Sequence, residues 1–276
     1  MPLVPSAEII RPAAATAGGV GAFNVIQLEL AEAIVAGGED AGRPVILQIS
    51  QNCVKYHGRL APIARACQAL ARDAATPVAV HLDHAESFEL IGEALDLGFD
   101  SIMYDGSKLP DQANRAATAA VAALAHARGA WVEAELGEIG GKDGVHAPGV
   151  RTDPEDAAQF VRDTGVDSLA VAVGSSHAMT SRDAKLDFEL IAAIHAAVPV
   201  PLVLHGSSGV PDGDLAAAVK AGMTKINIAT LLSQRFTGAV RATLDDNPTL
   251  VDTRKYFAPA REAVRAAVGG LLEVIA

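Results

Sequence analysis

The sequence has few cysteines and no excess of basic charge, and each of these shortages excludes a class of protein. Two cysteines, Cys53 in an expected loop and Cys67 in an expected helix, cannot build a disulfide framework in 276 residues, so we expect a reducing cytoplasm. The net charge of -11 argues against a general nucleic-acid binder, which needs a basic surface. Residues 1–20 lack the pattern of a signal peptide, and charged residues interrupt every long apolar run, which predicts a soluble protein.

Apolar runs of strand length alternate with amphipathic segments of helix length along the whole chain. The expected strands are 21–25, 44–50, 77–83, 101–105, 131–136, 168–173, 201–205 and 225–229. The expected helices are 27–41, 60–75, 87–97, 110–128, 154–164, 187–197, 211–221 and 230–245, with a closing helix at 258–275. Ser87 and Asp153-Pro154 are typical of helix starts.

Eight strand–helix units in series predict an α/β fold, a (β/α)8 TIM barrel that forms a single domain over residues 1–276. The structural alternative is an open, doubly wound parallel sheet. Its dinucleotide-binding version is disfavoured because no GxGxxG turn follows the first strand. The longest irregular connection, 137–152, contains five glycines and is a candidate lid.

Three histidines occupy equivalent positions, each just past a predicted strand, and two carboxylates share that position. Because barrels keep their chemistry at the carboxyl ends of their strands, these five side chains are expected to meet at one rim. A lone histidine there would more often be a hydrogen-bonded loop residue, but three with two acids favour a metal. Imidazole and carboxylate ligands without paired thiolates suit zinc or a similar divalent ion, and three protein ligands leave a position open for substrate. The five residues are His84, Asp105, Glu135, His177 and His205.

The segment HLDH at 81–84 carries a second histidine and an acid. His81 and His84 are three residues apart and should face opposite sides of a strand, which excludes an HxH metallohydrolase site. We therefore expect His81 in the core and Asp83 in the barrel mouth beside the metal. The alternative for Asp83 is a helix cap or a hydrogen-bond partner of a ligand histidine.

Two segments are rich in small residues and lead into helices: 206–209 follows the seventh predicted strand, and 227–230 ends the eighth. Barrels often bind phosphate at these positions on backbone N–H groups and a helix N-terminus. A Schiff-base lysine is disfavoured, because no lysine sits at the C-terminal end of a predicted strand and Lys225 is expected at the N-terminal end of strand eight.

With these motifs the chain resembles the class II, metal-dependent ketose-bisphosphate aldolases, nearly from end to end. The motifs that carry the resemblance are, in order, GAFNV, HLDH, YDGS, VEAELGEIGG, GSSH, KLDFE, HGSSG, KINIAT and RKYFAPAREA. The resemblance implies reversible cleavage of a ketose 1,6-bisphosphate, most simply fructose 1,6-bisphosphate, into dihydroxyacetone phosphate and glyceraldehyde 3-phosphate. It also implies a homodimer or homotetramer and a monovalent cation near the phosphate.

The resemblance further implies roles for individual residues. Zinc would bind His84, His177 and His205, while Asp105 and Glu135 would hold a second or displaced metal. Asp83 would exchange a proton with the C4 oxygen. The implied substrate contacts are Asn24, Ser50, Ala178, Lys185, Gly206, Ser207, Ser208, Asn227, Ile228, Ala229 and Thr230.

The candidate lid departs from the family pattern, which has a Glu-Asp pair shortly after Gly-Gly. Here Asp143 is the nearest substitute for the proton-moving glutamate, and Glu138 is the second choice. Ala178 also replaces a glycine that often follows the second zinc histidine. Alternatives therefore stay open: a tagatose 1,6-bisphosphate aldolase, another phosphoketose aldolase, or a metal- and phosphosugar-binding barrel with little catalysis.

Overall fold

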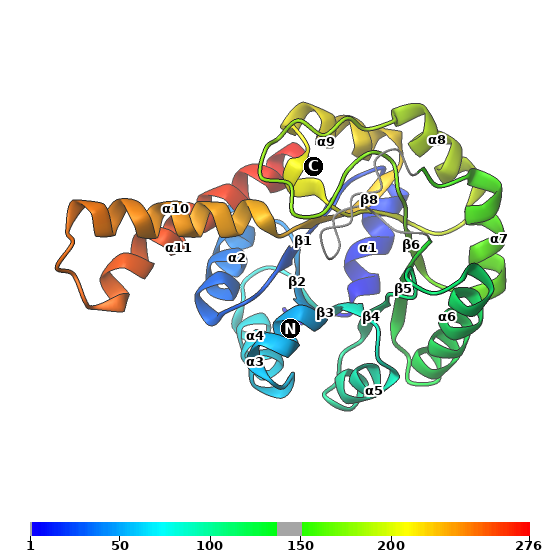
Figure 1. Cartoon of the computed structure of the whole chain (residues 1–276), viewed down its shortest axis with the longest axis horizontal. Helices are drawn as coiled ribbons and strands as arrows, with labels where there is room; N and C mark the ends of the chain where they lie inside the picture. The colour runs from blue at the N-terminus through cyan, green and yellow to red at the C-terminus, as the bar shows by residue number, and fades with distance from the viewer. Residues whose placement is uncertain (1, 137–150) are drawn as a thin grey trace.

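The strands form one closed parallel barrel in the computed structural model, which describes residues 2–136 and 151–276 (Figure 1). Each strand pairs with the next, and β1 pairs with β8 to close the sheet. The predicted fold class is thus confirmed. The strands are β1 Val20–Asn24, β2 Val45–Ser50, β3 Val78–Ala85, β4 Ser101–Tyr104, β5 Trp131–Glu135, β6 Ser168–Ala170, β7 Leu202–Leu204 and β8 Met223–Ile228.

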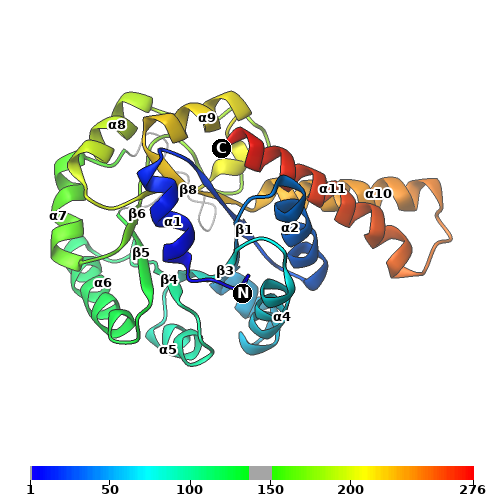
Figure 2. The same cartoon turned by 180° about the vertical axis from the view of Figure 1, so that it is seen from behind.

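Helices surround the barrel because their apolar faces pack on the outside of the sheet (Figures 1 and 2). In α7, for example, Ala157, Phe160, Val161 and Thr164 are buried at helical spacing. The helices are α1 Ser6–Ala15, α2 Leu28–Ala41, α3 Gln51–His57, α4 Ala61–Asp73, α5 Phe88–Asp96, α6 Asp111–His126, α7 Pro154–Thr164, α8 Phe188–Ala197, α9 Asp212–Ala221, α10 Thr230–Asp246 and α11 Thr253–Val274.

The expected helix starts at Ser87 and Asp153 are confirmed. The Ser87 hydroxyl accepts a hydrogen bond from the backbone N–H of Leu90 at 3.3 Å and begins α5. The Asp153 carboxylate accepts hydrogen bonds from Glu155 N–H and Asp156 N–H at 2.9 and 3.0 Å. Both side chains satisfy N–H groups that a helix cannot pair internally, which fixes where the two helices begin.

Helix α1, which the sequence pattern did not predict, covers the N-terminal end of the barrel (Figure 2). Its Ile9 and Ile10 pack against Val20, Ile46 and Trp131, which lie at or near the starts of their strands. The helix was missed because it precedes the first strand–helix unit and contains Pro12. It leaves the opposite end, where the strands finish, as the end that can hold a site.

Three further predictions need correction. Cys53 lies in α3 and not in a loop, because Ser50 caps this two-turn helix by accepting a hydrogen bond from Cys53 N–H at 3.1 Å. Strand β6 ends at Ala170, since Ala172 exchanges hydrogen bonds with Thr152 at 2.9 Å instead of extending the ladder. Helix α11 begins at Thr253 and continues through a proline.

Strand β8 begins at Met223, earlier than predicted, and this correction matters for the site. Lys225 is therefore an internal residue of the strand, and its side chain is fully buried. The predicted start at Lys225 was two residues late, because Met223 and Thr224 follow the helix-ending Gly222 and read as part of the loop. Polar side chains placed inside this barrel lie directly under the rim that carries the histidines.

Helices α10 and α11 pack together and project from the side of the barrel as a long hairpin (Figures 1 and 2). Where α11 passes α2, a Cβ on Gly37 would lie 2.7 Å from the Arg265 carbonyl oxygen, so only glycine fits. Arg265 also forms an ion pair with Asp40 at 2.5 Å. No helix within the described part of the chain is both long and apolar enough to cross a bilayer.

Candidate active site

Four of the five predicted ligand residues meet at the carboxyl-terminal rim of the barrel. His84 lies at the end of β3 and Glu135 at the end of β5, while His177 and His205 follow β6 and β7. One ligand atom from each lies within 4.8 Å of the corresponding atom of every other residue. The three imidazole rings stand edge-on to one another, with centroids 4.8 to 5.5 Å apart. This donor set, three imidazoles and one carboxylate, fits a zinc ion.

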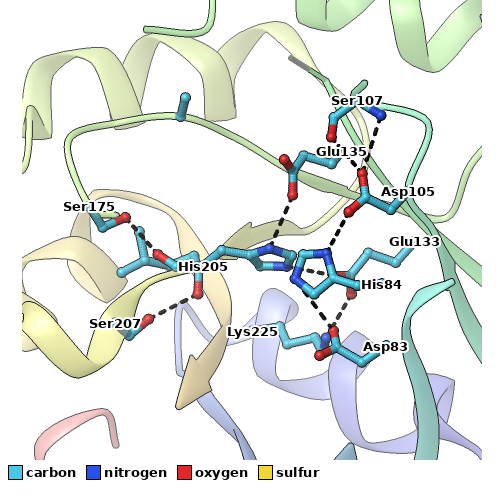
Figure 3. Close-up of polar contacts among 12 residues, drawn as sticks. Asp83, His84, Asp105, Ser107, Glu133, Glu135, Ser175, His205, Ser207 and Lys225 are labelled. Atoms are coloured by element: carbon cyan, nitrogen blue, oxygen red, sulfur yellow. Dashed lines mark hydrogen bonds and ion pairs between the residues drawn. The ribbon is translucent and has the colours of Figure 1, made fainter. Parts of the chain in front are cut away.

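Asp105, the fifth predicted ligand, contacts His84 instead of joining these four residues. Its Oδ2 lies 2.8 Å from His84 Nδ1, and its Oδ1 accepts hydrogen bonds from Ser107 N–H and Oγ at 3.2 and 2.6 Å (Figure 3). With Nδ1 engaged, Nε2 is the His84 nitrogen that remains for a metal. Asp105 therefore orients the imidazole ring, an arrangement common around metal-binding histidines.

A local distortion brings two consecutive residues, Asp83 and His84, to the same site. His84 has φ +48, and the register between β3 and β4 shifts between Leu82 and Ala85. An undistorted strand would send neighbouring side chains to opposite faces, whereas here Asp83 Oδ1 lies 4.0 Å from His84 Nε2. A positive φ at a residue other than glycine is unfavourable by about 1–2 kcal/mol, and such strain often marks functional sites.

Asp83 is buried, and a chain of amides holds its side chain. Asn24 Nδ2 donates to Asp83 Oδ2 at 2.9 Å, and Gln48 Nε2 donates to Asn24 Oδ1 at 3.1 Å. Oδ1 has no hydrogen-bond partner within the described part of the chain. Burial alone would raise the pKa of Asp83, but the positive charges of His84, Lys225 and His205 hold it below its usual range. A fixed carboxylate with one available oxygen is suited to accept a proton.

His205 lies between two carboxylates at the centre of the site (Figure 3). Its Nδ1 is 3.3 Å from Glu135 Oε2, and its Nε2 is 3.1 Å from Glu133 Oε1. Burial would lower the pKa of His205, but the hydrogen bond with Glu133 and the neighbouring carboxylate of Glu135 raise it to about 9. The negative field that attracts this proton would equally attract a divalent cation.

A cavity beside the histidines gathers most of the predicted substrate contacts. Gly206, with φ +68, follows β7 and approaches the backbone of Ser176, while the Ser208 hydroxyl accepts hydrogen bonds from Ala229 N–H and Leu231 N–H at 3.2 and 3.1 Å. These contacts place the start of α10 at the cavity. The lining residues are Asn24, Ser50, Asn52, Asp83, His84, His177, Ala178, Gly206, Ser208, Asn227, Ala229 and Thr230.

Three other predicted contacts lie elsewhere. Ser207 is buried and its hydroxyl donates to the Leu204 carbonyl at 2.9 Å, the Ile228 side chain is buried, and Lys185 is exposed. None of these three lines the cavity. Asp143 and Glu138 lie outside the described residues.

A second cavity adjoins the first and shares Ser50, Asn52, His84, His177 and Ala178 with it. It extends over α3 and the turn after β4 and is lined there by Gln51, Lys55, Glu86 and Lys108. Sequence reasoning did not single out these residues, because two of them lie in the short α3 and the others in loops. Both cavities are lined by His84 and His177.

Glu133 and Lys225 were also missed, although a signal for Glu133 existed. In WVEAEL, Glu133 and Glu135 are two residues apart, so alternation along β5 places both side chains inside the barrel. Lys225 Nζ lies 2.8 Å from Glu133 Oε2, and both side chains are buried. Burial raises the pKa of Glu133, but Lys225 and His205 outweigh this effect and hold it well below its usual range.

Comparison with known proteins agrees with this geometry. Residues 4–276 match the model of the family described as fructose-bisphosphate aldolase class-II. The chain belongs to this family. It is 39% identical over 274 residues to the fructose-bisphosphate aldolase of Staphylococcus epidermidis RP62A, covering 98% of this chain and 96% of that protein. It is 40% identical over 274 residues, with the same coverage, to a protein of Bacillus subtilis 168 named "Probable fructose-bisphosphate aldolase".

Solved structures agree with the sequence relatives. The YdjI aldolase from Escherichia coli K12 superposes with a TM-score of 0.86 at 31% identity, over 99% of this chain and 97% of that chain. Family membership confirms that the protein is an aldolase and hence a lyase, as the motifs predicted. The alternative of a binding barrel with little catalysis is disfavoured accordingly.

Proposed function

We propose that this aldolase reversibly cleaves fructose 1,6-bisphosphate to dihydroxyacetone phosphate and glyceraldehyde 3-phosphate, with zinc bound by His84, His177 and His205. The observation that carries the proposal is the convergence of these imidazoles with Glu135 beside a cavity that contains Asp83. The names of the curated relatives at 39–40% identity support fructose 1,6-bisphosphate as the substrate. Cytoplasmic location and homo-oligomeric assembly stay predictions.

The proposed chemistry divides between the metal and the chain's own residues. A bound zinc ion would act as a Lewis acid for the negative charge that develops on the ketone side as C3–C4 breaks. Asp83 would take the C4 hydroxyl proton through Oδ1 while the C4 oxygen becomes the aldehyde carbonyl. Asn24 would hold the carboxylate in place through Oδ2. General-base assistance of this kind contributes about 10²–10⁴-fold to rate.

The phosphate of the dihydroxyacetone half would bind in the cavity at Gly206, Ser208 and residues 227–230. Residues at the start of α10 and in the turn after β7 line this cavity. A helix N-terminus binds anions without a basic surface. Because the chain carries a net charge of -11, an anionic phosphate needs local binding groups of this kind. A proton at C3 would be returned by an acid of the 137–150 segment, for which Asp143 stays the prediction.

The first test compares cleavage of fructose and tagatose 1,6-bisphosphates by purified protein, with chelator and after zinc is restored. We expect chelator-sensitive cleavage that zinc rescues, with the higher kcat/KM for the fructose ester. Preference for the tagatose ester would change the substrate and keep the mechanism. Cleavage that persists without metal would refute the proposed Lewis-acid role.

A second test separates proton transfer from metal binding. Asp83→Ala should lose at least about 10²-fold in kcat and retain zinc, because Asp83 is proposed to move a proton and not to ligate the metal. Zinc content and kcat are measured on the same preparation. Asn114→Ala, a buried amide that donates to the Glu135 carbonyl oxygen at 3.3 Å and does not contact Asp83, serves as a control for general disturbance of the rim.

A further inference from the structure

A buried chain of charges runs from the metal-ligand candidate His205 into the barrel interior. His205 Nε2 is 3.1 Å from Glu133 Oε1, and Glu133 Oε2 is 2.8 Å from Lys225 Nζ (Figure 3). All three side chains are almost completely buried. Glu133 thus uses one oxygen for the histidine and the other for the lysine, which supplies its countercharge.

Fold stability alone does not account for this ion pair. Barrel interiors are usually filled by layers of aliphatic side chains, and a buried ion pair is often no more stabilising than well-packed apolar residues of similar volume. Trp131 shows that this interior can satisfy a polar group without charge, because its Nε1–H donates to Ser168 Oγ at 2.9 Å. The contact of Glu133 with His205 indicates a second role for Glu133 and Lys225.

That contact decides which nitrogen of His205 is available to a metal. A neutral imidazole has one N–H, and a carboxylate lies near each ring nitrogen, Glu133 at Nε2 and Glu135 at Nδ1. Only the contact at Nε2 has the geometry of a hydrogen bond. If the proton sits on Nε2 and is donated to Glu133, the Nδ1 lone pair faces the other ligands. If it sits on Nδ1 and is donated to Glu135, His205 cannot ligate from the side that faces the cluster.

We propose that Glu133, held by Lys225, is a positioning residue that keeps the His205 proton on Nε2 and so directs Nδ1 to the metal. The inference rests on the proposed function, because it requires a metal at this cluster. Glu133 acts through His205 and touches neither substrate nor metal. Lys225 fixes the second oxygen of Glu133, so the carboxylate cannot rotate away from the ring.

The test measures zinc affinity by competition with a chromophoric chelator in two variants that differ at one position. Both contain Lys225→Met, which removes the buried ammonium; one adds Glu133→Met and the other Glu133→Gln. The Gln variant retains an acceptor oxygen for His205 Nε2–H, and the Met variant does not. We expect the Met variant to bind zinc about 10–100-fold more weakly than wild type and the Gln variant to recover most of that loss.

Ser168→Ala is the matched control, because it breaks a buried hydrogen bond of the same barrel interior that does not involve His205. It should bind zinc as the wild type does. Equal zinc affinity of the Met variant, the Gln variant and the wild type would overturn the inference. Equal weakening in Ser168→Ala and the Met variant would also overturn it, because packing would then explain the effect.

A measurement on the unmodified protein makes the test independent of how the variants fold. Nitrogen-15 spectra of the zinc-loaded wild type should show His205 with its proton on Nε2 and its metal on Nδ1. A metal on Nε2 would overturn the inference even if the enzyme cleaves its substrate. Failure of the wild type to bind zinc would instead refute the proposed function, so the two failures are distinguishable.

Discussion

Gly206 is the residue at which a single methyl group should disturb the site most directly. Its φ of +68 is unfavourable for alanine by about 1–2 kcal/mol. A Cβ there would also lie 2.5, 2.6 and 2.9 Å from the carbonyl oxygen, carbonyl carbon and nitrogen of Ser176. Backbone atoms cannot rotate away, and overpacking of this kind costs about 1–3 kcal/mol. We expect Gly206→Ala to lower the free energy of unfolding by about 2–5 kcal/mol.

Gly42→Ala is the control for the backbone conformation alone. Gly42 has φ +60, close to that of Gly206, and nothing lies within 4 Å of a Cβ built on it. At Gly42 only the cost of a positive φ applies, and the steric cost is absent. The free energies of unfolding of the two variants, measured with denaturant on metal-free protein, should therefore differ by about 1–3 kcal/mol. Because Ser176 precedes His177, Gly206→Ala should also weaken zinc binding, and Gly42→Ala should not. Equal losses of stability in the two variants would refute the steric argument.

Three other predictions follow from the contacts of single residues. Asp105→Ala should weaken zinc binding about 10–100-fold, whereas His84→Ala should weaken it far more; equal effects in a chelator competition would show that Asp105 is itself a ligand. Ser50→Ala should lower the free energy of unfolding by about 1 kcal/mol in urea, because α3 loses its cap, and an unchanged midpoint would contradict this role. The pKa of Glu133 is held below its ordinary value of 4.5, so its contribution to stability is complete above that pH and is lost as the pH falls below it. Metal-free wild type should accordingly lose stability more steeply than Glu133→Gln/Lys225→Met between about pH 5 and 3, and parallel pH profiles would exclude the effect.

The periodicity of the sequence was sufficient to predict the barrel, because each strand–helix unit repeats the same pattern. It failed where a segment lies outside that repeat: α1 precedes the first unit, and α3 is a two-turn helix inserted after β2. The predicted end of a strand was also wrong where a side chain replaces a hydrogen bond between strands, as Thr152 does beside β6. These are tertiary contacts that a local pattern does not contain.

In the candidate site, too, the sequence predicted some features and not others. The positions of His84, His177 and His205 after their strands predicted that they would meet, and they do. Simple alternation could not place Asp83 and His84 on the same side, because that outcome depends on the positive φ at His84. Asp105 was expected beside the metal, yet whether a carboxylate reaches a metal or only a histidine depends on side-chain geometry that spacing does not define.

The distortion at His84 also bears on how this enzyme could change over evolution. The proposed ligands Glu135, His177 and His205 belong to different strand–loop units of the barrel, so their spacing changes whenever these units shift relative to one another. Asp83 and His84 are joined by one rigid peptide unit, so the carboxylate proposed to transfer a proton and the neighbouring proposed ligand move together. The spacing between the proposed acid and the proposed ligand is therefore independent of the surrounding loops, so those loops could change without altering it.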